Sequence, residues 1–373
     1  MAFRVRAEAL REALSRVLPI VPSRALYPIT QHILIYQAGD SVELRATDLE
    51  ISMRTFLSVL PEEGDAVRLA IPPKPLNDLL RGFPEDEVLS VRQRDTTLGL
   101  SASYGRYEFG GVPSEEFPHF PTQESAGGVG LGLSVLDEVI SQTAFAASKD
   151  DARLALTGIY FDFRENYTHF VATDAHTLVR IRRSDIRLPG SPALLVPVRA
   201  LQALQQAFRG FLSEDELTLF PGEGQVLFHH PQLDLVCRLI DARYPDYESV
   251  IPTNPPYTAR LRTEAFRKAL KRLTVISDKT AGVIRLHFQP SSLTLSAEDT
   301  LQNRSGQESL PCEYEGPDFR IAFRGSVLSG VLDHLQAEEF ILRMEAPGRA
   351  VVIEPDPQAP PSEALFLAMP LMI

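Results

Sequence analysis

Residues suited to acid–base or metal chemistry form few groups at useful spacing in this 373-residue chain. Asp174 and His176 lie two residues apart, as a carboxylate–imidazole pair could, but no Ser or Cys nucleophile in a recognisable elbow accompanies them. His229 and His230 are adjacent, and neighbouring side chains of a strand point to opposite faces, which is unsuitable for shared metal ligation. We therefore expect no catalytic residue, no metal and no cofactor.

Two other features could suggest chemistry but have plainer interpretations. The glycines between Gly127 and Gly132 resemble a dinucleotide-binding fingerprint, yet they precede an expected strand instead of following one, which indicates a linker. Cys237 and Cys312 lie far apart in separate expected strands. We expect both to be buried as small apolar side chains, with no disulfide and no metal.

A long internal repeat organises the elements of the chain. The phrase Ala-Thr-Asp, or its variant Ala-Glu-Asp, recurs about every 126 residues, at 46–48, 172–174 and 297–299. Paired strands flank each copy, at 33–36 with 42–46, 158–163 with 168–172, and 283–288 with 293–297. A period of this length predicts three copies of one domain.

Each copy is also expected to carry two helices. Apolar side chains at helical spacing predict a first helix beginning at Ala7, Ser134 and Thr263, with Ser134 and Thr263 as N-caps. The second helices are expected at 75–81, 199–208 and 327–335. The fold class is therefore α+β, in three tandem domains at 1–125, 126–255 and 256–373, separated by short turn-rich linkers at 125–128 and 253–256.

The charge of the chain limits the kinds of partner it can bind. The net charge is −12 and the isoelectric point is about 5.2, so a surface that grips DNA phosphates everywhere is excluded. Basic residues nevertheless gather on expected helices, among them Arg267, Lys268, Lys271 and Arg272. No apolar run approaches 18 residues and no signal-peptide pattern opens the chain, so we expect a soluble, cytoplasmic protein.

Several segments, in chain order, resemble the bacterial DNA polymerase III β subunit family, the sliding clamps. The segments that carry the resemblance are Ser23 to Ile29, Ala46 to Glu50, Val171 to Leu178, Tyr244 to Pro252 and Met369 to Leu371. The resemblance implies that two chains close head to tail into a ring of six domains, with antiparallel sheets outside and two helices per domain inside. It also implies a non-enzymatic processivity factor that encircles duplex DNA, without reading its sequence, and tethers the replicative polymerase.

The resemblance further implies a pocket between the middle and last domains for short linear peptides of the polymerase and the clamp loader. Its residues here would be Leu156, Thr173, Ala175, His176, Thr177, Leu178, Pro245, Val250, Leu367 and Met369. Ala175, Thr177 and Ser249 stand where the family usually has Gly, Arg and Arg. The loss of two positive groups should shift the preferred peptide away from acidic flanks.

DNA contacts and a homodimer interface are implied in the same way. DNA would be met by Arg24, Lys74, Arg81, Lys149, Arg153 and Arg199, while Leu154 and Ala155 replace a tyrosine pair of some members. The interface would join Arg106, Tyr107 and Phe109 of one chain to Leu273, Ile276 and Lys279 of the next. No membrane partner is expected. The alternative is a peptide-binding adaptor of the same fold that does not encircle DNA, and the basic helices favour the clamp.

Overall fold

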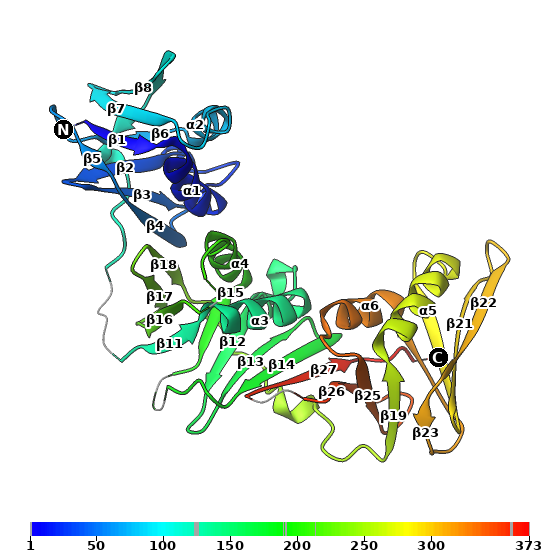
Figure 1. Cartoon of the computed structure of the whole chain (residues 1–373). Helices are drawn as coiled ribbons and strands as arrows, with labels where there is room; N and C mark the ends of the chain where they lie inside the picture. Colours follow the sequence, from blue (N-terminus) through cyan, green and yellow to red (C-terminus); the bar gives the residue numbers. More distant parts are fainter. Residues whose placement is uncertain are drawn as a thin grey trace. The chain divides into compact units, whose positions relative to one another are not determined.

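The computed structural model describes residues 2–122, 127–188, 190, 192–212, 214–358 and 361–372. These residues form two compact units, the first made of 1–136 with 199–239 and the second of 137–198 with 240–373. The middle third of the chain therefore contributes to both units, as the green segment of Figure 1 shows. Ser125 and Ala126 of the first expected linker lie outside the described residues.

The first unit contains two antiparallel sheets. The smaller has the order β5-β1-β7-β8-β9, with β5 Leu60–Pro61, β1 Phe3–Arg6, β7 Val88–Arg94, β8 Thr97–Ala102 and β9 Gly105–Gly110. The larger has the order β10-β6-β2-β3-β4-β18-β17-β16-β11, with β10 Val112–Pro113, β6 Arg68–Ile71, β2 Ile33–Ala38, β3 Ser41–Thr47, β4 Ile51–Ser58, β18 Leu233–Arg238, β17 Gln225–His230, β16 Glu216–Pro221 and β11 Val129–Gly132. Pairing of β4 with β18 joins the first and middle thirds into one sheet.

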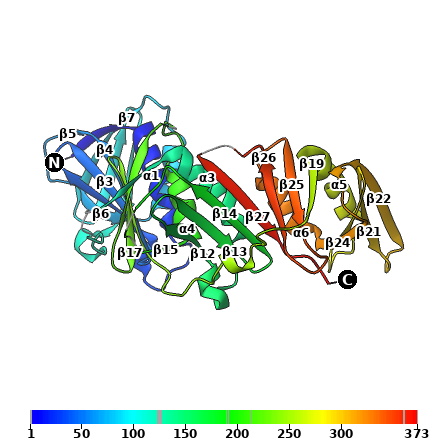
Figure 2. The same ribbon diagram turned by 90° about the horizontal axis from the view of Figure 1, so that it is seen from below.

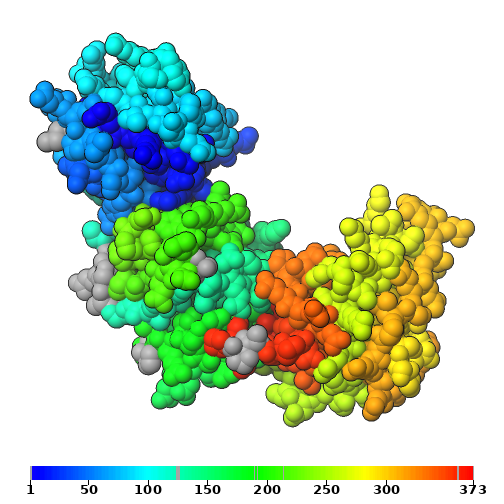
Figure 3. Space-filling model, in the orientation of Figure 1, coloured from blue at the N-terminus to red at the C-terminus, as the bar shows by residue number. Residues whose placement is uncertain are grey.

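The second unit repeats this plan. Its larger sheet has the order β15-β12-β13-β14-β27-β26-β25-β19-β23 (Figure 2), with β15 Leu194–Pro197, β12 Gly158–Phe163, β13 Thr168–Thr173, β14 Thr177–Arg183, β27 Ser362–Ala368, β26 Val351–Asp356, β25 Glu339–Met344, β19 Tyr257–Arg262 and β23 Glu313–Tyr314. The smaller has the order β22-β21-β20-β24, with β22 Arg304–Pro311, β21 Ser292–Asp299, β20 Val283–Gln289 and β24 Phe319–Arg324. Here β14 pairs with β27, so the red C-terminal strand lies against the middle third (Figure 3).

The six expected helices are present close to their predicted positions. The first helices of the three copies are α1 Ala7–Val17, α3 Leu133–Thr143 and α5 Thr263–Ile276, and the second are α2 Pro73–Leu80, α4 Val198–Ala207 and α6 Gly325–His334. In Figure 1, α1 lies beside α2, and α5 beside α6. In α1 the buried residues follow helical spacing, at Ala7, Leu10, Ala13, Leu14 and Val17, so one apolar stripe faces the sheet.

The two predicted N-caps are wrong. Ser134 lies in the first turn of α3, which begins at Leu133. Thr263 is the first residue of α5, after Arg262 in the cap position, and its buried hydroxyl has no hydrogen-bond partner. In the third copy the strand runs directly into the helix, so the cap position falls on the last strand residue.

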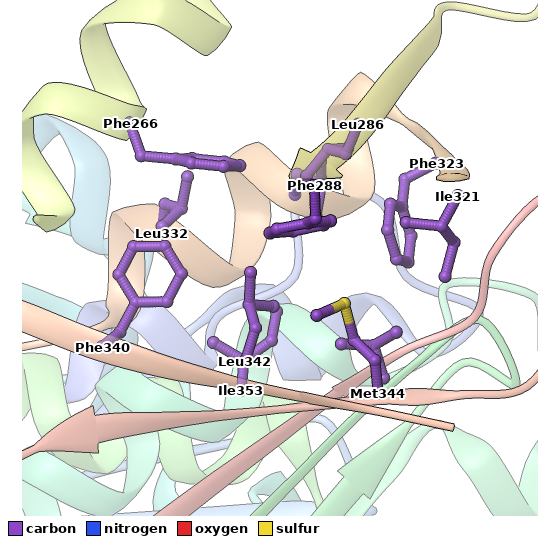
Figure 4. Close-up of a pocket in the computed structure, with 12 residues that line it drawn as sticks. Phe266, Leu286, Phe288, Ile321, Phe323, Leu332, Phe340, Leu342, Met344 and Ile353 are labelled. Carbon is purple, nitrogen blue, oxygen red and sulfur yellow. The ribbon is translucent and has the colours of Figure 1, made fainter. Parts of the chain in front are cut away.

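The interior of the third domain is closely filled by aromatic and aliphatic side chains (Figure 4). Phe266 of α5 and Phe340 of β25 meet edge to face, with ring centroids 5.5 Å apart. The space that the lining side chains enclose measures about 10 Å³, at the lower limit for one water molecule. This cavity is therefore a packing gap in the core.

The expected burial of both cysteines is confirmed. Cys237 and Cys312 are buried and free, and burial raises the pKa of both thiols, that of Cys312 to about 12.

Within the described residues, no group of three or more His, Cys, Asp and Glu is placed to hold a metal ion. None of the described helices is both long enough and apolar enough to span a bilayer.

Candidate functional site

The Ala-Thr-Asp phrase of the middle third forms a tight turn between β13 and β14. The Asp174 carboxylate accepts hydrogen bonds from the backbone N–H groups of His176 and Thr177, at 2.9 and 2.7 Å. The Thr173 hydroxyl donates to the Thr177 carbonyl at 2.7 Å and accepts from the Ala175 N–H at 3.1 Å. Asp174 therefore meets His176 through the backbone, in a structural turn and not a catalytic pair.

The first third contains the same turn between β3 and β4. The Asp48 carboxylate accepts from the N–H groups of Glu50 and Ile51, at 3.0 and 2.7 Å, and the Thr47 hydroxyl donates to the Ile51 carbonyl at 3.1 Å. Leu49 and Ala175 occupy matching positions with φ of 78° and 75°, the left-handed region that favours glycine. In the first two copies the repeated phrase is thus a turn signature, and Thr173 makes the same turn hydrogen bonds as Thr47.

An apolar cluster on one face of the larger sheet of the second unit underlies the predicted pocket. Leu178 of β14 lies opposite Leu367 of β27, which in turn lies opposite Val352 of β26. Tyr244 and Tyr247, from the segment between β18 and β19, cover these side chains. Ala350, Val352 and Leu365 were missed by the sequence reasoning, because continuous apolar runs such as 351–353 and 364–368 do not indicate which face of the sheet each residue occupies.

The ten predicted pocket residues separate into a buried floor and an exposed rim. Thr173, Thr177, Leu178 and Leu367 are buried. Leu156 is half-buried, and the rim residues are Ala175, His176, Pro245, Val250 and Met369. The Met369 N–H donates to the His176 carbonyl at 2.8 Å, which ties the C-terminal segment to the turn. The exposed fractions of Val250 and Met369, 51% and 39%, leave apolar surface available to a ligand.

A buried polar chain holds the covering segment on the sheet. The Tyr247 hydroxyl donates to Asp162 Oδ2 at 2.6 Å, and Arg164 donates to the same oxygen through Nε at 2.9 Å and Nη2 at 2.7 Å. His169 Nδ1 lies 2.8 Å from the Tyr247 hydroxyl. Because Tyr247 has given its only proton to Asp162, Nδ1 of His169 is the donor in that contact.

The charges around this chain decide its protonation. Burial, assisted by the nearby Arg180 charge, lowers the pKa of His169 to about 3, so the ring is neutral near neutral pH. Burial, and then the bond to the Asp162 carboxylate, raises the pKa of Tyr247. The bond to Asp162 likewise raises the pKa of Arg164. His169 is therefore neutral, while Tyr247 keeps its proton and Arg164 its charge.

Two of the six predicted DNA-contacting residues are engaged within the chain. Arg199 of α4 forms an ion pair with Asp48 and donates to the Ile20 carbonyl at 3.4 Å. Arg153 donates to the Asp174 carbonyl at 3.3 Å. Both arginines thus contact an Ala-Thr-Asp turn. The other four, Arg24, Lys74, Arg81 and Lys149, are exposed and form no ion pair with another described residue.

The predicted interface residues lie on or beside two sheet edges. Tyr107 and Phe109 are half-buried in the edge strand β9, and Arg106 is exposed. Leu273 is only 2% exposed and lies beneath Gly306 of the edge strand β22, where a Cβ would come within 3.1 Å of it. Ile276 is half-buried and Lys279 exposed, and the neighbouring Val275 is 70% exposed.

Comparison with known proteins places this geometry in a family. Models of the N-terminal, central and C-terminal domains of the DNA polymerase III beta subunit match residues 1–121, 131–246 and 248–370. The beta sliding clamp of Synechococcus elongatus is 30% identical over 375 residues, which cover 99% of this chain and 98% of that protein. The chain belongs to the DNA polymerase III beta subunit family. The Escherichia coli K12 clamp is 25% identical over the full length of both chains.

Solved sliding clamps share the fold. The Pseudomonas aeruginosa clamp bound to griselimycin matches with a TM-score of 0.93 and 22% identity over all of both chains. The Thermotoga maritima beta subunit matches with a TM-score of 0.91 and 21% identity over 100% of this chain and 99% of that one. The predicted α+β fold of three tandem clamp domains is therefore confirmed. The beta subunits are non-catalytic, which agrees with the structural use of Asp174.

Proposed function

We propose that this clamp-family chain acts as a DNA sliding clamp, in which two copies enclose duplex DNA and tether the replicative polymerase. The observation that carries this function is the match to all three beta-subunit domains in order, over nearly the whole chain. A net charge of −12 suits a protein that holds DNA by enclosure, because enclosure needs no strong phosphate binding and permits sliding. Adding the clamp and its loader should lengthen the products of single polymerase binding events, and unchanged product lengths would contradict the proposal.

The dimer is proposed to form through the open sheet edges. Both β9 and β22 are edge strands, each six or more residues long, and on one side neither pairs with another strand of the described residues. An exposed edge of this length favours pairing with another strand. Head-to-tail pairing of β9 with β22 of a second copy would cover both edges and place Phe109 near Ile276. Light scattering should give twice the 41.4 kDa chain mass, and a monomer at every concentration would contradict this arrangement.

The apolar surface between Val250 and Met369 is proposed as the site for short peptides of the polymerase and the clamp loader. Its support is a rigid floor of Leu178 and Leu367 beneath an exposed rim that includes a flexible methionine, a combination that accepts varied apolar anchors. With Thr177 and Ser249 where the family usually has Arg, the site offers no positive charge at these two positions to acidic flanks of a peptide.

Griselimycin, bound in the Pseudomonas aeruginosa and Bartonella birtlesii clamps, is a suitable probe of this site. We expect it to bind this chain, and Met369→Ala to weaken binding by about tenfold because it removes apolar contact area. Lys74→Ala, a matched change at an exposed side chain of the other unit, should leave the affinity unchanged. Equal affinities of the wild type and Met369→Ala would refute the pocket.

A further inference from the structure

We infer that Tyr247 and His169 are positioning residues for partner capture: their hydrogen bonds hold the segment that forms one side of the pocket rim. The inference rests on the proposed peptide-binding role of that pocket. It concerns residues that are buried, so they would not touch a partner themselves. Their effect would pass through Pro245 and Val250, which flank Tyr247 in the chain and are exposed.

The segment between β18 and β19 depends on side chains for its position. Between Arg238 and Tyr257 its only helical turn is the short 3₁₀ segment Glu248–Val250. Its backbone reaches the large sheet of the second unit through the Ile240 N–H, which donates to the Leu195 carbonyl at 2.9 Å near the start of the segment. Farther along, Tyr244, Tyr247 and Ile251 pack on the apolar cluster. The side chains therefore decide where the rim lies.

The two tyrosines hold the segment in different ways. The Tyr244 ring stacks on Tyr160, with centroids 4.5 Å apart and planes 4° from parallel, and its hydroxyl makes only a 3.3 Å contact to the Val171 carbonyl. Stacking of this kind tolerates small sliding movements of the ring. Tyr247 instead ends in a 2.6 Å bond to the Asp162 carboxylate. A short bond to a charged acceptor is stronger and directional, so Tyr247 fixes the position that Tyr244 leaves adjustable.

His169 completes the restraint on Tyr247. The Nδ1–H of His169 donates to the tyrosine oxygen, while Arg164 holds Asp162 from the other side. The residues lie on β12, β13 and the loop that joins them, so the anchor belongs to the sheet and not to the covering segment. In a buried network of this kind, removing one member leaves the others unsatisfied. Loss of the Tyr247 hydroxyl should therefore allow the segment between β18 and β19 to move, so that Pro245 and Val250 no longer hold one position at the rim.

The test compares griselimycin affinity, by titration calorimetry on the full chain, with thermal midpoint. Tyr247→Phe should weaken binding by about tenfold, because a bond to a charged group is lost from the element that forms the rim. Tyr314→Phe is the matched control: Tyr314 is 2% exposed and donates to the Pro317 carbonyl at 2.8 Å, in the same unit but outside the cluster. It should lower the midpoint and leave the affinity unchanged.

A second pair of variants tests the role of the histidine. His169→Asn keeps an N–H donor near the place of Nδ1 and should retain most of the affinity, whereas His169→Leu should lose it as Tyr247→Phe does. Equal loss in both histidine variants, or equal loss in Tyr247→Phe and Tyr314→Phe, would overturn the inference. If Met369→Ala weakens binding and Tyr247→Phe does not, the inference fails and the pocket stands. If neither change weakens binding, the proposed pocket itself is wrong.

Discussion

Asp48 and Arg199 form an ion pair that connects the Ala-Thr-Asp turn of the first third to the second helix of the middle third. Asp48 uses one carboxylate oxygen to accept two backbone N–H groups of its own turn and the other to bind Arg199. One side chain thus shapes a hairpin and joins two repeats within the first unit. Arg199, one of the predicted DNA contacts, is therefore paired with a carboxylate of its own chain.

The two partners of this ion pair should differ in their effect on stability. Arg199 is 55% exposed, so solvent screening limits the cost of Arg199→Ala to about 0.5 kcal/mol of unfolding free energy. Asp48 is 8% exposed and also caps the turn, so Asp48→Ala should cost about 2 kcal/mol. Urea denaturation of both variants measures the difference. If both variants lose the same unfolding free energy, Asp48 stabilises the fold only through the ion pair and not through the turn.

Salt-dependent DNA binding should separate free from engaged basic residues. Lys74→Ala should lower the slope of log affinity against log salt by about 0.9, the value expected for one lost phosphate contact. Arg199→Ala should change the slope less, because Asp48 already neutralises that side chain. Fluorescence anisotropy with a labelled duplex over a salt series measures both slopes. If Arg199→Ala lowers the slope as much as Lys74→Ala does, the ion pair opens on DNA and Arg199 contacts a phosphate.

The turn of the middle third should tolerate glycine at its strained position. Ala175 has φ of 75°, which costs a residue with a Cβ about 1 kcal/mol relative to glycine. The greater freedom of glycine in the unfolded chain offsets about 0.4–1 kcal/mol of that gain. Ala175→Gly should therefore be neutral or slightly stabilising in thermal unfolding. The matched change Ala172→Gly, in the buried strand β13, should destabilise clearly, and the opposite order would contradict the turn geometry.

The decrease in the free energy of unfolding at acid pH should show that His169 is neutral in the folded chain. The pKa of His169 is about 3 in the folded chain, compared with 6.5 for an unperturbed histidine in the unfolded chain. Below pH 6.5 the unfolded chain therefore binds a proton that the folded chain does not. Above pH 6.5 the titration of His169 does not lower the free energy of unfolding. As pH falls from 6.5 toward 3, protonation of the unfolded chain lowers that free energy by up to about 1.4 kcal/mol per pH unit.

The histidine can be distinguished from the carboxylates that also titrate in acid. Arg180, Arg182, Arg164, Asp162 and Glu248 surround His169, and all of them remain in His169→Asn. We expect that variant to lose less stability than the wild type between pH 6.5 and 5, measured as the shift of the urea midpoint. Parallel curves would show that His169 becomes charged in the folded chain.

Much of the fold follows from local patterns in the sequence. The helices and paired strands were predictable because apolar spacing and the repeated turn phrase recur in every third. The caps at Ser134 and Thr263 were not, because a strand that runs directly into a helix leaves no separate capping residue. The remaining miss is tertiary: Val352 joins the apolar cluster of the second unit through packing between segments distant in sequence.

Retention on DNA of different topology tests the central claim most directly. The labelled clamp, loaded by its clamp loader onto closed circular DNA, should stay bound during gel filtration in moderate salt. After a single cut linearises the same DNA, the clamp should slide off the ends and elute as free protein. Equal retention on circular and linear DNA, or equal loss from both, would contradict enclosure and favour a peptide-binding adaptor that does not encircle DNA.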